Sequence, residues 1–131
     1  MMHKLVATLN EVALLMSNTH AKIPLEVDIP TFYHKVYAPA LKKIMAIADI
    51  LTIMAYERKN VEQVLDSVNP ILDYATEMNQ PFFIGFNAKD FTKEDDLDEL
   101  IHKVAIRLQS RDSFKGFAIH AYRRYRELVE R

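Results

Sequence analysis

The sequence has no cysteine and only two glycines, Gly85 and Gly116. The lack of cysteine excludes disulfides, thiolate metal sites and a cysteine nucleophile. The scarcity of glycine excludes the usual Gly-rich loops of P-loop and dinucleotide-binding proteins, in which backbone amides must approach phosphates closely. Because no disulfide framework points to an oxidising compartment, a cytoplasmic location is the default expectation.

An excess of charge of one sign is also missing. The chain has 17 Lys and Arg against 18 Asp and Glu, a formal net charge of -1, so neither nucleic acid nor an anionic membrane is expected as a partner. The N-terminal apolar stretch is interrupted by Asn10 and Glu11 and is too short and polar for a signal peptide or a membrane span. With 131 residues, half of them apolar, the sequence predicts one soluble domain over 1–131.

Four short apolar runs are present, at 23–29, 47–56, 81–87 and 114–120. The last three are nearly continuous rather than alternating, which is typical of strands covered on both faces in a parallel sheet. Their starts lie 24, 34 and 33 residues apart, a spacing that suits one βα unit each. The runs therefore predict four parallel strands.

The intervening segments show helical periodicity. At the N-terminus one face carries Leu5, Leu9, Val12 and Met16, widened by Leu14 and Leu15. After the second run, Asn69 and Pro70 suggest the cap and first position of a new helix, with a kinked single helix as the alternative. A stripe of Leu97, Leu100, Ile101, Val104 and Leu108 predicts the next helix, and a last one is expected at about 122–130.

The predicted order is thus one helix followed by four βα units, with about five helices in all. This order gives an α/β fold with a parallel sheet and right-handed crossovers. Two architectures fit it: an open doubly wound sheet, or one half of a TIM-type (β/α)8 barrel, whose full chain is typically about 250 residues. The doubly wound fold usually turns at glycines, and such turns are not found here.

Three segments resemble strands of glycoside hydrolase-like barrels. DILTIMAY, ending at Tyr56, resembles the sixth strand of family 18 chitinases, where a Met-x-Tyr sequence projects the tyrosine into the sugar site. FKGFAIHAY, ending at Tyr122, is similar to the final strand of uncharacterised bacterial barrels of this type, and PFFIGFN to a penultimate strand. LEVDIP would then be the fifth strand. The resemblance covers nearly the whole chain and implies the carboxyl-terminal half of such a barrel.

The acidic motif of family 18 enzymes, Asp-x-x-Asp-x-Asp-x-Glu on the fourth strand, is missing. The acidic cluster from Glu94 to Glu99 has a different spacing and lies on a predicted amphipathic helix. Glycoside hydrolysis normally needs two positioned carboxyl groups, and no such pair is evident. Whether the chain is an enzyme stays open: it would be glycoside hydrolase-like only if assembled with a missing half.

Candidate site residues follow from the rule that functional groups of barrels lie at the carboxyl ends of strands. Asp28 and His120 are the candidate catalytic residues, His120 because imidazole exchanges protons near neutral pH. The candidate ligand-binding residues are Tyr56, Glu57, Asn87, Lys89, His120 and Tyr122. Several of them also have a structural interpretation. Asp28 could cap the following loop, and Tyr56 could pack in the interior with its hydroxyl hydrogen-bonded. Glu57 could be a solvated loop residue, and His120 a hydrogen-bonded structural residue.

Two other groups of residues are given structural roles. Arg123, Arg124 and Arg126 are interleaved with tyrosines, but nearby Glu127 and Glu130 favour a solvated helix face over a nucleic-acid site. The histidines show no i, i+3 or i, i+4 pairing, so neither a metal nor another cofactor is predicted.

Two functions of different classes are compatible with this sequence. The first is a half-barrel whose strand ends form a carbohydrate-binding surface, here called the mouth, centred on Tyr56, Asn87 and His120. It is not expected to be a complete hydrolase. The second is a non-catalytic α/β interaction module that self-associates through its sheet. In both cases the predicted protein partner is a second copy of the chain or a partner half-barrel, because four strands alone leave two open edges.

Overall fold

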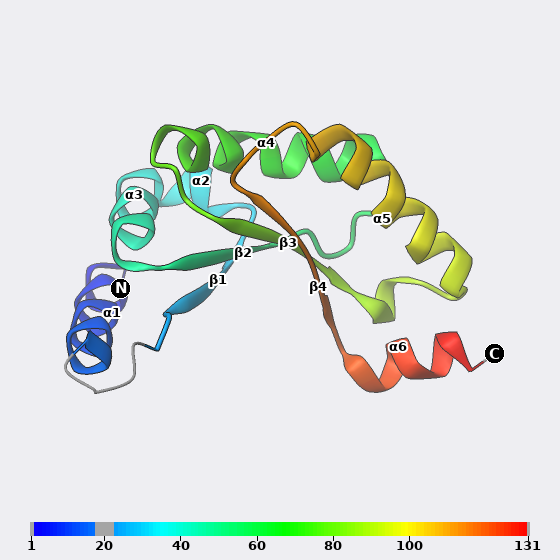
Figure 1. The fold of residues 1–131 in the computed structure, drawn as a ribbon, viewed down its shortest axis with the longest axis horizontal. Helices are drawn as coiled ribbons and strands as arrows, with labels where there is room; N and C mark the ends of the chain where they lie inside the picture. The colour runs from blue at the N-terminus through cyan, green and yellow to red at the C-terminus, as the bar shows by residue number, and fades with distance from the viewer. Residues whose placement is uncertain (1, 18–22, 131) are drawn as a thin grey trace.

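The computed structural model describes residues 2–17 and 23–130. Within these ranges the chain forms four strands, six α-helices and one short 3-10 helix (Figure 1). All four predicted strands are confirmed, and one more helix than expected lies between the first two. The elements are α1 (Met2–Ser17), β1 (Glu26–Pro30), α2 (Tyr33–Val36), α3 (Ala38–Ile47), β2 (Ile50–Met54), α4 (Val61–Glu77), β3 (Phe82–Asn87), η1 (Ala88–Asp90), α5 (Glu94–Leu108), β4 (Phe114–His120) and α6 (Tyr122–Val129).

The four strands form one parallel sheet in the order β1-β2-β3-β4. The structure therefore has the predicted α/β fold with parallel βα repeats. Because the strand order never reverses, the sheet has no switch point of the kind that defines a doubly wound fold. Sequential order is what one half of a (β/α)8 barrel requires, and here it leaves β1 and β4 as the two edges of the sheet.

The helices α2 to α5 lie along one side of the sheet, while α1 and α6 lie towards its two ends (Figure 1). The core forms between that helical layer and alternate residues of the strands. On the strand side it contains Ile29, Leu51, Ile53, Phe82, Ile84 and Phe86; the helices contribute Leu41, Ile44, Met45, Val64, Leu65, Val68, Ile71, Leu72, Ala75, Leu97, Leu100, Val104 and Leu108. The predicted stripe of α5 is thus confirmed as a buried face.

The other face of the sheet, here called the open face, carries Glu26, Asp28, Ile50, Thr52, Met54, Phe83, Gly85, Ala118 and His120. The Thr52 hydroxyl donates a hydrogen bond of 2.7 Å to Glu26 on this face. A Cβ at Gly85 would meet the Thr52 methyl at 3.2 Å, which places both residues on the same side. Ile50, Met54 and Phe83 are half-buried, and among the described residues none belongs to the core cluster.

One extra residue in β4 changes which side chains enter the core. Phe82 pairs with Phe114, but Phe83 pairs with Gly116, so Lys115 is an insertion in the ladder. Gly116 has a φ of 132°, a backbone conformation that favours glycine, as is common at such bulges. As a result both Phe114 and Phe117 pack against the core, with ring centroids 5.3 Å apart, although simple alternation would put them on opposite faces.

Two sequence predictions about helices are wrong. No new helix starts at Pro70, and the alternative of a single helix is the one found: α4 runs from Val61 to Glu77 with Pro70 inside it, because the buried face continues across the proline from Val68 to Ile71. Leu14 and Leu15 do not widen the buried face of α1; their exposed fractions are 65% and 69%. The main contact of α1 among the described residues is with α3.

A search of residues 2–17 and 23–130 for membrane-spanning helices finds none that combines enough length with enough apolar character to cross a bilayer.

Candidate functional site

The parallel sheet brings the carboxyl ends of its four strands to one edge. Asp28 lies near the end of β1, Tyr56 follows β2, and Asn87 and His120 are the last residues of β3 and β4. The register places Asn87 directly beside His120. Because Met54 pairs with Gly85, two residues further along Tyr56 is level with Asn87. Tyr56, Asn87 and His120 are therefore at the same height of the sheet, whereas the register places Asp28 further back from this edge.

Tyr56 and His120 contact each other across β3. Their ring centroids are 5.6 Å apart with an interplanar angle of 30°. Adjacent strands are about 4.8 Å apart, so residues on β2 and β4 are separated by about twice that distance at the backbone. The two rings therefore lean towards each other over β3. Gly85, two residues before Asn87 on β3, has no side chain on the open face.

The hydroxyl of Tyr56 lies in an acidic environment. Burial raises the pKa of Tyr56 above its ordinary value, and the negative charges of Asp28 and then Asp90 raise that pKa further. Asp28 is exposed and Asp90 half-buried, and both carboxylates act on the same phenol. Burial and the two carboxylates thus disfavour the ionised form of this phenol.

This arrangement predicts a pH effect. Unfolded tyrosine ionises with a pKa of 10.0, whereas in the folded chain the pKa of Tyr56 is higher. The folded state therefore holds this proton more tightly, and the stability contributed by the protonated phenol is present below pH 10.0 and is lost as the pH rises through the folded pKa. Ultraviolet titration of phenolate should show one tyrosine ionising late, and Tyr56→Phe should remove that late component.

Asp28→Asn is the matched control for the cause of this shift. Removing one negative charge next to the phenol should bring the pKa of Tyr56 closer to 10.0. A late component that survives in Tyr56→Phe would show that another tyrosine carries it.

Asp90 is a mouth residue that sequence reasoning missed. It lies in η1, directly after β3, and its carboxylate accepts a hydrogen bond of 2.7 Å from the backbone N–H of Glu57. Glu57 has a φ of 64°, so this bond helps to hold a strained turn after β2. The signal for Asp90 was its position in the loop after a predicted strand, the same rule that selected Asn87 and Lys89.

The remaining predicted residues lie in different surroundings. Glu57 is exposed and lines a separate hollow of about 490 Å³ between the loop after β1 and the start of α4, and its role in ligand binding stays a prediction. The side-chain oxygen of Asn87 accepts from the backbone N–H of Lys89 at 3.0 Å and caps η1. Tyr122 begins α6, and its side chain lies outside the described residues.

Asn87, Lys89 and His120 line a hollow of about 560 Å³ next to α6, here called the α6 hollow. Its other walls are Ala121, Arg123, Arg124 and Glu127. The prediction of a solvated helix face is wrong for Arg124, whose side chain is only 24% exposed. Arg124 donates to the backbone carbonyl of Phe91 at 3.2 Å and pairs with Glu127 at 3.4 Å, so it joins α6 to the loop before α5.

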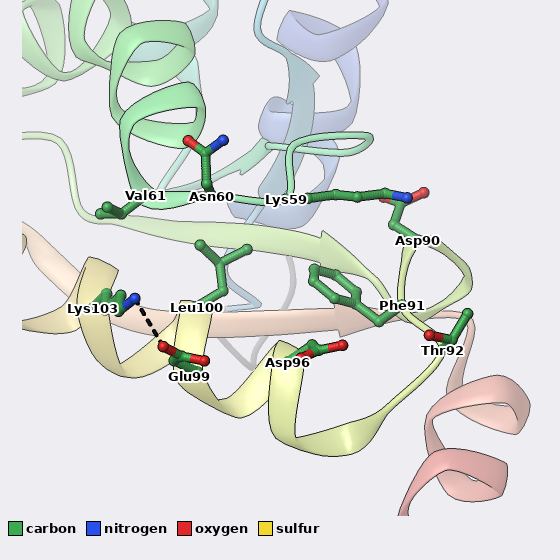
Figure 2. Close-up of a pocket in the computed structure, with 10 residues that line it drawn as sticks. All are labelled: Lys59, Asn60, Val61, Asp90, Phe91, Thr92, Asp96, Glu99, Leu100 and Lys103. Carbon is green, nitrogen blue, oxygen red and sulfur yellow. Dashed lines mark ion pairs between the residues drawn. The ribbon is translucent and has the colours of Figure 1, made fainter.

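A further hollow, of about 310 Å³, lies on the flank of the molecule between the start of α4 and α5 (Figure 2). Its lining includes the ion pair between Lys103 and Glu99, at 2.8 Å, which lowers the pKa of Glu99 through a hydrogen bond and through the lysine charge. Both side chains are more than half exposed, and such i, i+4 pairs contribute little. No residue predicted from the strand ends lies in this hollow.

Comparison with known proteins gives no match: none among protein-family models, none among curated proteins and none among solved structures. Among the described residues, no group of three or more His, Asp or Glu is arranged to hold a metal ion. The case for a site therefore depends on the geometry at the strand ends. There, two aromatic rings, two carboxylates and a hollow with basic side chains converge from β1, β2, β3, β4 and α6.

Proposed function

We propose that the mouth binds a carbohydrate. The observation that carries this proposal is the pair of Tyr56 and His120, whose rings lie 5.6 Å apart over β3 with Asp28 and Asp90 near the phenol. Aromatic rings suit the apolar faces of sugars, and carboxylates accept hydrogen bonds from sugar hydroxyls. The resemblance of the Met54 to Tyr56 segment to the sugar-binding strand of family 18 chitinases points to the same ligand class.

The mouth is proposed as a binding site rather than a complete hydrolase. Hydrolysis needs one carboxyl group as acid and another as base or nucleophile. Asp90 already accepts the Glu57 backbone N–H, and Asp28 is exposed at an edge strand. The chain alone is therefore expected to turn over chromogenic glycosides negligibly.

The proposal is tested by removing one hydroxyl group. Tyr56→Phe keeps the ring but loses the donor, so its dissociation constant for chitotriose should rise about two- to tenfold, the effect of one hydrogen bond of about 0.5–1.5 kcal/mol. Tyr74→Phe is the matched control, because Tyr74 lies on α4 under Lys42, on the helical side of the sheet. Isothermal titration calorimetry measures both.

Two results would overturn the proposal. One is the absence of saturable binding by the wild-type chain for chitotriose and for maltotriose. The other is an equal affinity of Tyr56→Phe and the wild type, with both variants folded by circular dichroism.

The second candidate function is self-association through the open face. Ile50, Met54 and Phe83 lie on this face, half-buried and outside the core cluster of the described residues. The strand edges are less suited to pairing, because β1 has five residues and ends in Pro30, and β4 carries Lys115 at an irregularity of the ladder. A second copy that covers the open face would bury these three apolar side chains.

A further inference from the structure

The charge of the α6 hollow differs from that of the chain. The hollow is lined by Lys89, Arg123 and Arg124 and by a single carboxylate, that of Glu127. The whole chain, in contrast, has a formal net charge of -1. His120 and the amide of Asn87 add polar groups without negative charge. Three basic side chains are therefore gathered where the mouth borders α6.

Two of these cations are not used by the fold. Arg124 pairs with Glu127 at 3.4 Å and donates to the Phe91 carbonyl. Lys89 and Arg123 form no ion pair with any carboxylate of the described residues, although both line the hollow. Their charges are available to a ligand that enters it.

The mouth also contains negative charge. Asp28 and Asp90 both act on the hydroxyl of Tyr56, and the Tyr56 ring contacts His120, which lines the α6 hollow. A ligand over this aromatic pair would therefore be near acceptor carboxylates and also near the lysine and arginine of the α6 hollow. Hydroxyl groups of the ligand suit the carboxylates, and a phosphate or carboxylate group suits the lysine and arginine.

We propose that the α6 hollow binds the anionic group of a negatively charged sugar, a sugar phosphate or a uronic acid, through Lys89 and Arg123. This inference rests on the proposed carbohydrate function of the mouth and specifies its substrate class. The side-chain oxygen of Asn87 is held by the Lys89 backbone N–H, which leaves the amide nitrogen of Asn87 as a further donor. A neutral sugar would leave both cations without a partner.

The test compares glucose, glucose 6-phosphate, glucuronate and inorganic phosphate as ligands of the full chain by isothermal titration calorimetry at low ionic strength. Glucose 6-phosphate or glucuronate should bind about tenfold more tightly than glucose, and the advantage should shrink as salt is added. Comparison of the two acids shows which anion the hollow prefers. Lys89→Gln and Arg123→Gln should each remove most of the advantage.

Lys43→Gln is the control for net charge. Lys43 is an exposed residue of α3, which lies far from α6 in Figure 1, and its loss changes the chain charge by the same amount. The advantage of the anionic sugars should survive in this variant.

The outcomes separate this inference from the proposed function. Equal affinity for glucose and both acids, or an advantage that persists in Lys89→Gln and Arg123→Gln, overturns the inference and leaves the carbohydrate site standing. Inorganic phosphate bound through Lys89 and Arg123 without any sugar binding supports the anion site and contradicts the carbohydrate function. Failure of all four ligands overturns the inference, and the titrations with chitotriose and maltotriose then decide the carbohydrate function.

Discussion

Replacing Phe86 by alanine is expected to lower the free energy of unfolding by about 3–5 kcal/mol. The Phe86 side chain is 0% exposed, on the face of β3 that packs against the helices, and it stacks on Phe117 with a centroid distance of 5.7 Å. Its removal leaves a cavity that neighbouring side chains fill only in part. Since domains of this size are stable by about 5–15 kcal/mol, urea denaturation should show a large shift in midpoint.

Phe83→Ala is the matched control from the same strand. Phe83 lies on the open face, half-buried, with its ring next to Gly116. At a protein concentration that keeps the chain monomeric, its loss should cost about 1–1.5 kcal/mol, in proportion to the smaller apolar area it buries. Equal losses for Phe83→Ala and Phe86→Ala would contradict the assignment of one covered and one open face.

Self-association is expected to double the mass of the particle. Sedimentation equilibrium over a dilution series should show a mass that rises from 15.2 kDa towards twice that value with increasing concentration. At about 25 cal/mol per Å² of apolar surface, burial of several hundred Å² on the open face favours association by several kcal/mol before the entropy of pairing is subtracted. The open face provides Ile50, Met54 and Phe83 for such a contact.

A charged substitution identifies the surface that associates. Phe83→Asp should weaken the dimer at least tenfold, because the contact would bury an unpaired carboxylate. Phe32→Asp is the control, since Phe32 is 53% exposed and lies in the loop after β1, away from the open face. A chain that stays at 15.2 kDa at every concentration, or equal weakening by both variants, would remove the interaction module from consideration.

The strands were predictable because their apolar runs are nearly continuous and separated by helical segments. The run at 81–87 contains all of β3, and the run at 114–120 coincides with β4. The continuity of α4 through Pro70 was harder to predict. The local preference of Asn69 and Pro70 suggested that a new helix starts there, whereas burial of Val68 and Ile71 on one face stabilises a single helix. Tertiary packing thus outweighs the local effect of one proline.

The site was predicted in part. The rule of strand ends selected Tyr56, Asn87 and His120, and the structure places these residues level with one another. The contact between Tyr56 and His120 depends on the sequential strand order, which puts β2 and β4 on either side of β3 and which no local pattern reveals. Arg124 was assigned to solvent because its partner, the Phe91 carbonyl, is 33 residues away in sequence. Long-range pairing of this kind is visible only in the folded chain.

The most direct test of the central claim is an NMR titration of the isotope-labelled chain with chitotriose. If the mouth binds carbohydrate, the backbone amides of Tyr56, Asn87 and His120 should shift together along one saturation curve. Amides of the flank hollow, such as those of Lys59 and Leu100, should stay in place. Shifts confined to the flank hollow or to α1, or no shift at millimolar ligand, would contradict a carbohydrate site at the carboxyl ends of the strands.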